Sequence, residues 1–93
     1  MVGIVLASHG AFAEGIKESG QMIFGPQENV ATAVLTPDMG PDDMYQKLHD
    51  AVATFDDQEH VLFLVDLWGG TPFNQVSRIV DGGDHEDWVA VTG

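Results

Sequence analysis

The chain has 93 residues, of which 44% are hydrophobic and 19% are charged, and this balance predicts one small globular domain over residues 1–93. Its formal net charge is −12 with only three basic residues, Lys17, Lys47 and Arg78, which excludes a surface for nucleic acid. No cysteine is present, so disulfides, thiol nucleophiles and thiolate metal sites are excluded too.

The first predicted element is a strand over residues 2–8, a nearly unbroken apolar run. No basic residue flanks it, so the run indicates a strand and not a signal peptide. A helix is expected over residues 11–24, ended by Gly25-Pro26, with Gly20 where the helix approaches the sheet closely. The apolar stripe of this helix consists of Phe12, Ile16 and Ile23.

A second, more mixed strand is predicted over residues 29–36. The next helix begins at Pro41, because the fixed φ and missing N–H of proline suit a first helical position. Asp42 and Asp43 complement the helix dipole there. The buried stripe of this helix consists of Met44, Leu48, Ala51, Val52 and Phe55.

Residues 60–67 are another apolar run and predict a central strand. A third helix is expected with Thr71 at the N-cap and Pro72 at its first position. Residues 81–84, Asp-Gly-Gly-Asp, predict the turn after it, and residues 88–92 a fourth strand. The apolar face of the third helix consists of Phe73, Val76 and Val80.

This alternation predicts a right-handed, doubly wound α/β sandwich with a mainly parallel sheet of order 2-1-3-4. Ligands bind such sheets beyond the carboxyl ends of the strands, where the winding direction switches. Here the switch falls between the first and third strands. His9 and Asp66 stand at those two strand ends, so we expect them to form one site.

A neutral imidazole attacks phosphorus with one ring nitrogen when the other carries the proton and has an acceptor. Asp66 is the candidate acceptor for His9. Gly69, Gly70 and Thr71 precede a helix, and their backbone N–H groups are candidates to bind phosphoryl oxygens. Gly10 would let the backbone come close on the other side.

Other kinds of site find little support in the sequence. There is no phosphate-binding P-loop, no dinucleotide-binding glycine motif, and no Lys or Arg in either corner loop. We therefore expect no cofactor, and a phosphohistidine held loosely enough to be passed on. The remaining histidines, His49, His60 and His85, are scattered and do not form a zinc-ligand pattern, so no metal is expected.

The chain resembles the mannose-class enzyme IIA domains of the bacterial phosphoenolpyruvate-dependent sugar phosphotransferase system. The resemblance rests on residues 3–10, Gly-Ile-Val-Leu-Ala-Ser-His-Gly, on Glu28-Asn29-Val30, and on residues 61–74 with 77–80. It implies that His9 accepts a phosphoryl group from the carrier HPr and donates it to a histidine of enzyme IIB, with Asp66 as hydrogen-bond partner. Trp68 and Phe12 are candidate partner contacts, although Trp68 is equally a boundary core residue.

The resemblance also implies a cytoplasmic phosphotransferase component, typically a homodimer, that works at the membrane with subunits IIC and IID. The family domains continue with a further helix and a last strand that pairs with the other subunit. This chain stops at Gly93, so we expect a domain without those two elements. An unprotected strand edge predicts association.

Two alternatives remain open. The first is a domain of the same fold with a regulatory role, or one linked to a dihydroxyacetone kinase, in which phosphorylation of His9 is a signal. The second is a receiver-like domain phosphorylated on Asp66. Against the second, the first strand ends in Ser8-His9 and lacks an acidic pair for Mg²⁺.

Overall fold

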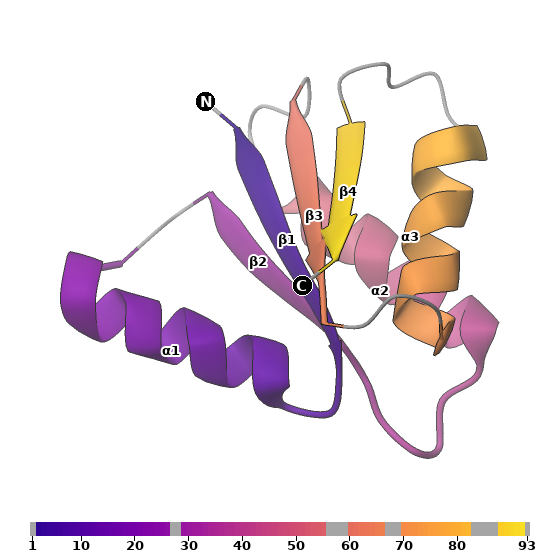
Figure 1. Ribbon diagram of the computed structural model, residues 1–93, viewed down its shortest axis with the longest axis horizontal. Coiled ribbons are helices and arrows are strands. Elements are labelled where there is room, and N and C mark those ends of the chain that lie inside the picture. Colours follow the sequence, from indigo (N-terminus) through magenta and orange to yellow (C-terminus); the bar gives the residue numbers. More distant parts are fainter. Residues whose placement is uncertain (1, 27–28, 56–59, 67–69, 83–87, 93) are drawn as a thin grey trace.

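The computed structural model describes residues 2–26, 29–55, 60–66, 70–82 and 88–92. Strands and helices alternate along them: β1 (Gly3–His9), α1 (Phe12–Phe24), β2 (Val30–Leu35), α2 (Pro41–Ala53), β3 (Val61–Val65), α3 (Gly70–Gly82) and β4 (Trp88–Thr92). This order confirms the predicted alternation. Figure 1 shows the strands side by side with helices on both sides of the sheet.

The sheet is parallel and its strand order is β2-β1-β3-β4, which confirms the predicted 2-1-3-4 order and the doubly wound fold. Ala7 of β1 lies level with Ala33 of β2 on one side and with Val65 of β3 on the other. The chain therefore winds outward in both directions from the β1–β3 pair. Because these strands are parallel, their carboxyl ends lie together at one edge of the sheet.

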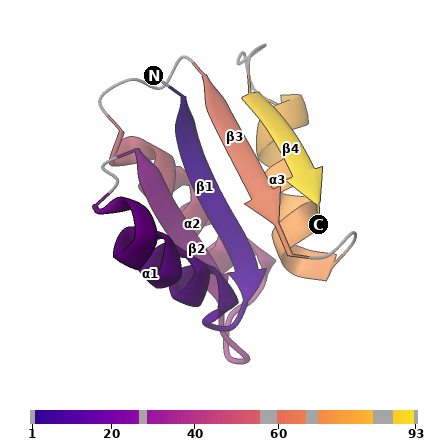
Figure 2. The same cartoon turned by 60° about the vertical axis from the view of Figure 1, so that its left-hand side comes forward.

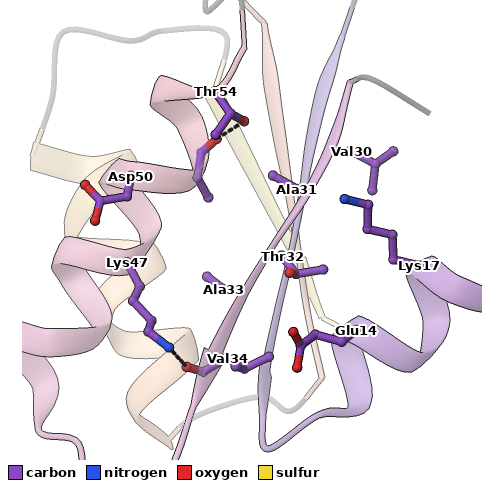
Figure 3. A pocket seen from close by; sticks show the side chains of 11 residues that line it. Glu14, Lys17, Val30, Ala31, Thr32, Ala33, Val34, Lys47, Asp50 and Thr54 are labelled. Atoms are coloured by element: carbon purple, nitrogen blue, oxygen red, sulfur yellow. Dashed lines mark hydrogen bonds between the residues drawn. The ribbon is translucent and has the colours of Figure 1, made fainter. Parts of the chain in front are cut away.

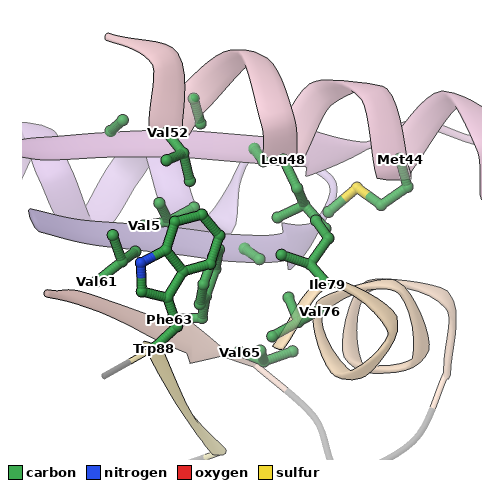
Figure 4. Packing of buried hydrophobic residues seen from close by; sticks show 14 of the residues in the cluster. Val5, Met44, Leu48, Val52, Val61, Phe63, Val65, Val76, Ile79 and Trp88 are labelled. Atoms are coloured by element: carbon green, nitrogen blue, oxygen red, sulfur yellow. The ribbon is translucent and has the colours of Figure 1, made fainter. Parts of the chain in front are cut away.

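The hydrophobic core lies between one face of the sheet and the helices α2 and α3. Figure 4 shows Val5 and Phe63 of the strands meeting Leu48 of α2 and Val76 of α3. These four side chains are fully buried. The centroids of the Phe63 and Trp88 rings lie 5.8 Å apart. This single well-packed layer holds β1 and β3 in register and so fixes where their ends lie.

Among the described elements, α1 is the one that covers the other face of the sheet, and it packs on β1 and β2 (Figure 2). The prediction that Gly20 marks a close approach to the sheet is wrong, because a Cβ added there would meet nothing within 4 Å. The apolar stripe of α1 is likewise largely exposed, and only Ala13 is buried. The reason is that α1 packs on β1 and β2, so its apolar side chains border a part of the sheet that no other described element covers.

Two element boundaries differ from the predictions in ways that affect the site. β1 runs one residue further and ends on His9 itself. α3 begins at Gly70, so Thr71 lies inside the helix and the prediction that it is the N-cap is wrong. Gly70 has a φ of 81°, and this left-handed residue turns the chain one position earlier than a threonine cap would.

The far end of α3 also runs further than predicted. Asp81 and Gly82 belong to the helix and not to the turn that the sequence suggested. Ile79 is buried and Val80 packs against the core, so the helix gains apolar contacts through its last turn. Residues 83 and 84 of the predicted turn lie outside the described residues.

Candidate functional site

His9 and Asp66 meet at the carboxyl ends of β1 and β3. His9 is the last residue of β1, and Asp66 directly follows Val65, the last residue of β3. The backbone N–H of Asp66 donates to the carbonyl of Ala7 at 3.2 Å and so extends the pairing of the two strands. Each side chain is thus anchored by the sheet, at the point where the winding direction switches.

One carboxylate oxygen holds both the backbone and the ring of His9. Asp66 Oδ2 accepts the backbone N–H of His9 at 3.0 Å and lies 3.2 Å from the ring nitrogen Nδ1. A carboxylate can only accept, so Nδ1 carries the proton in this pair. The lone pair of the neutral ring is then on Nε2, the nitrogen that faces away from Asp66.

The two side chains differ in their access to solvent. His9 is 42% exposed whereas Asp66 is 15% exposed, so the ring is open to a partner and the carboxylate lies behind it. The second oxygen of Asp66, Oδ1, is buried and has no hydrogen-bond partner among the described residues.

The beginning of α3 lies against the edge of the ring that carries Nε2. A Cβ added to Gly70 would lie 3.3 Å from Nε2 and 3.2 Å from Cε1 of His9, so only glycine leaves this edge free. The N-terminus of a helix carries partial positive charge and free N–H groups. A group bound to Nε2 would therefore lie where an anion is stabilised.

The other predicted site residues are placed less uniformly. Gly10 has a φ of 62°, but its N–H donates to the Leu35 carbonyl at 2.7 Å and is thus already used. Thr71 is half-buried in the first turn of α3. Phe12 is exposed at the start of α1. Gly69 and Trp68 lie outside the described residues.

Ser8 is a site residue to which the sequence analysis gave no role. It is buried at the end of β1 beside the start of α1, and its hydroxyl is hydrogen-bonded to the backbone at Gly10 and Ala13. The signal in the sequence was a serine shortly before a helix, which is typical of a helix cap. Ser8 stands in the strand, however, and not at the position next to the helix.

One groove of the described structure lies beside the site and a larger one lies along the edge of the sheet. A groove of about 350 Å³ lies beside the site and is lined by Asp66, Phe12 and mostly apolar side chains. A larger one, of about 640 Å³, follows the free edge of β2 between α1 and α2 (Figure 3). Lys47 closes part of that edge by donating to the Val34 carbonyl at 3.3 Å. The larger groove contains neither His9 nor Asp66.

The remaining histidines stay away from this site. His49 is exposed on α2 with its ring against that of Tyr45, and His60 is exposed just before β3. His85 lies outside the described residues. Across the described ranges, no group of three or more His, Cys, Asp or Glu side chains is arranged to hold a metal ion.

The sequence and the fold both match known proteins. Residues 3–93 match the family model EIIA-man, described as "PTS system fructose IIA component". The chain is 38% identical over 89 residues to the PTS system mannose-specific EIIAB component of Escherichia coli K12, a match that spans 96% of this chain and 28% of that protein. It is 32% identical over 90 residues to the fructose-specific EIIA component of Bacillus subtilis, where it spans 62% of that protein.

Solved structures give the same result for the fold. The crystal structure of phosphotransferase system component EIIA from Streptococcus agalactiae superposes with a TM-score of 0.89 at 32% identity, covering all of this chain and 69% of that one. The mannose/sorbose-specific IIA subunit from Enterococcus faecalis superposes with a TM-score of 0.80 at 30% identity. The chain thus spans less than two thirds of the two curated relatives and about two thirds of the solved chains.

Proposed function

Because this chain belongs to the mannose/fructose EIIA family of the sugar phosphotransferase system, we propose that it relays a phosphoryl group through His9. In this proposal His9 accepts the group from the phosphohistidine of HPr and passes it to a histidine of enzyme IIB. The observation that carries the proposal is the geometry of one ring. Nδ1 is held by Asp66, and Nε2 faces the beginning of α3.

Transfer begins when the lone pair of Nε2 attacks the phosphorus of the donor phosphohistidine. The new N–P bond forms as the bond to the donor nitrogen breaks, and that electron pair returns to the donor ring. Positive charge develops on the ring of His9 while Nδ1 keeps its proton. Asp66 fixes the tautomer, orients the ring and offsets this charge.

The phosphoryl oxygens would be stabilised by backbone groups and not by cations. Gly70 and Thr71 at the start of α3 are the candidate donors, together with Gly69, whereas the N–H of Gly10 is already bonded to Leu35. Neither corner loop contains Lys or Arg. A site with weak, uncharged donors releases the group easily, which suits a carrier that must both accept and donate.

The proposed relay also predicts the partners of the protein and its place in the cell. We expect HPr and enzyme IIB to reach His9 from the solvent side, with Phe12 and Trp68 among their contacts. None of the helices in the described ranges is long and apolar enough to cross a bilayer. We place the protein in the cytoplasm, associated with membrane subunits IIC and IID, with homodimer formation expected in longer family members.

The test is to incubate the protein with labelled phosphoenolpyruvate, enzyme I and HPr, and then to examine the stability of the label. A phosphohistidine survives alkali and is lost in acid, whereas an acyl phosphate on Asp66, as in a receiver domain, is lost in both. We expect an alkali-stable label that disappears in His9→Ala. Undiminished labelling of that variant would falsify the relay through His9.

Replacing Asp66 tests its role in the same assay. We expect Asp66→Ala to slow transfer by about 10² to 10⁴, the range typical of general acid–base contributions, because the ring loses its orientation and its counter-charge. Circular dichroism of the variant checks that the fold is retained. Transfer at the wild-type rate would remove Asp66 from the mechanism.

A regulatory role of the same histidine is the alternative. The chemistry at His9 would be the same in both roles. The relay and the regulatory role differ in whether the phosphoryl group passes on to enzyme IIB. Mixing the labelled protein with a mannose-class enzyme IIB decides between them. Transfer of the label to IIB supports the relay, and retention on His9 supports signalling.

A further inference from the structure

Ser8 lies buried directly before His9, and its hydroxyl is used in both directions. It donates to the carbonyl of Gly10 at 3.0 Å and accepts the backbone N–H of Ala13 at 2.9 Å. Within the described part of the chain, Ser8 is the one polar or charged residue that is buried, at 1% exposure. A buried hydroxyl with both bonds made holds its neighbours in place, since losing it would strand their polar groups.

The first of these bonds fixes the turn after His9. Gly10 has a left-handed backbone, its N–H donates to the carbonyl of Leu35, and its own carbonyl accepts the Ser8 hydroxyl. Both peptide groups of Gly10 are therefore held. His9 itself is held before this turn by the bond from its backbone N–H to Asp66.

The second bond fixes the beginning of α1. The residue before this helix, Ala11, supplies no side-chain cap. Ala13 is buried, so its N–H needs a partner inside the protein, and Ser8 provides it from the end of β1. The strand and the helix on either side of His9 are thus joined by a single hydroxyl.

We infer that Ser8 is a positioning residue for phosphoryl transfer at His9, an inference that rests on the proposed function. The ring of His9 is 42% exposed, so its orientation depends strongly on the backbone of His9. Ser8 holds that backbone so that Nδ1 stays on Asp66 and Nε2 stays against Gly70. Ser8 also accepts the N–H of Ala13 at the start of α1, so this N–H is not available to the phosphoryl group. The start of α3 is then the helix end that can bind it.

The test compares Ser8→Ala with Thr54→Val in the 93-residue chain. Thr54 also donates a side-chain hydroxyl to a backbone carbonyl, that of Ala51, but it lies at the end of α2, away from His9. We expect Ser8→Ala to transfer the phosphoryl group from HPr about 10- to 100-fold more slowly, since a misplacement of about 1 Å can cost about 10²-fold. Thr54→Val should stay within about twofold of the wild type, because distant sites act independently.

A spectroscopic readout separates positioning from stability. In the wild type, ¹⁵N NMR should show His9 as one tautomer with the proton on Nδ1. In Ser8→Ala the ring resonances should move toward those of a mixture of the two tautomers, and Ser8→Thr, which keeps the hydroxyl, should restore them together with transfer. If Ser8→Ala does not fold, Ser8→Cys replaces it, because a thiol has a similar shape and bonds weakly.

The inference is overturned if the Ser8 variant that folds transfers within about twofold of the wild type, or if its His9 resonances do not move. This failure differs from failure of the proposed function. Absence of an alkali-stable label on wild-type His9 would sink the relay itself, whereas the tautomer measurement needs no phosphoryl donor.

Discussion

At the scale of single residues, the ring of His9 has room beside α3 because Gly70 has no side chain. An added Cβ would lie 3.2 to 3.3 Å from the Cε1 and Nε2 atoms of the ring. We expect Gly70→Ala to lower the rate of transfer to His9 by about 10-fold or more, because even a shift of about 1 Å in a reacting group is costly. The measurement is the initial rate of label transfer from phosphorylated HPr.

The chain offers a matched control for this substitution. Gly25 has the same φ of 81°, and a Cβ there would meet nothing within 4 Å. Both alanine variants place a side chain at a φ that favours glycine, and thermal unfolding measures what each change costs in stability. Equal transfer rates in Gly70→Ala and Gly25→Ala would show that crowding of the ring does not matter.

The sequence predicted the two residues of the dyad because both stand at ends of apolar strands, and parallel strands bring those ends together. It did not predict that α3 begins at Gly70 or that a side chain at this position would crowd the ring. That contact depends on where the helix lies relative to β1, and no local pattern contains this information. The part played by Ser8 was missed for the same reason, since its partners are set by the turn at Gly10.

At the scale of the elements, α1 and α2 differ in how much of their apolar surface they bury. Leu48 of α2 is completely buried, whereas Ile23 of α1 is 73% exposed. We expect Leu48→Ala to lower the free energy of unfolding by about 2–5 kcal/mol, the range for large-to-small changes in a core. Ile23→Ala should change it by about 0.5 kcal/mol or less.

Chemical denaturation measures both variants under identical conditions. A loss in Ile23→Ala as large as that in Leu48→Ala would mean that α1 buries its apolar stripe in solution. The order of elements, the strand order and the start of α2 at Pro41 were all predicted from sequence. The exposure of α1 was not, because an apolar stripe shows which side of a helix seeks cover and does not show whether cover is present.

At the scale of the whole molecule, an uncovered apolar surface is combined with strong negative charge. The face of the sheet beyond α1 exposes Leu64, Val89 and Val91. With a formal net charge of −12, copies of the chain repel one another. Two opposing forces therefore act between molecules: long-range charge repulsion and short-range burial of apolar surface. Salt weakens the repulsion and leaves the apolar attraction in place.

This balance predicts association that increases with salt. The Debye length falls from about 30 Å at 0.01 M to about 3 Å at 1 M salt, so repulsion is screened while burial of apolar surface is retained. Sedimentation velocity should show monomers at low salt and larger species at high salt.

The double variant Val89→Thr/Val91→Thr removes apolar groups from residues that are 51% and 46% exposed and should suppress this association. Val2→Thr, at a residue that is 47% exposed and lies before β1, is the matched control and should associate like the wild type. Equal association of the double variant and the control would mean that the copies meet through another surface.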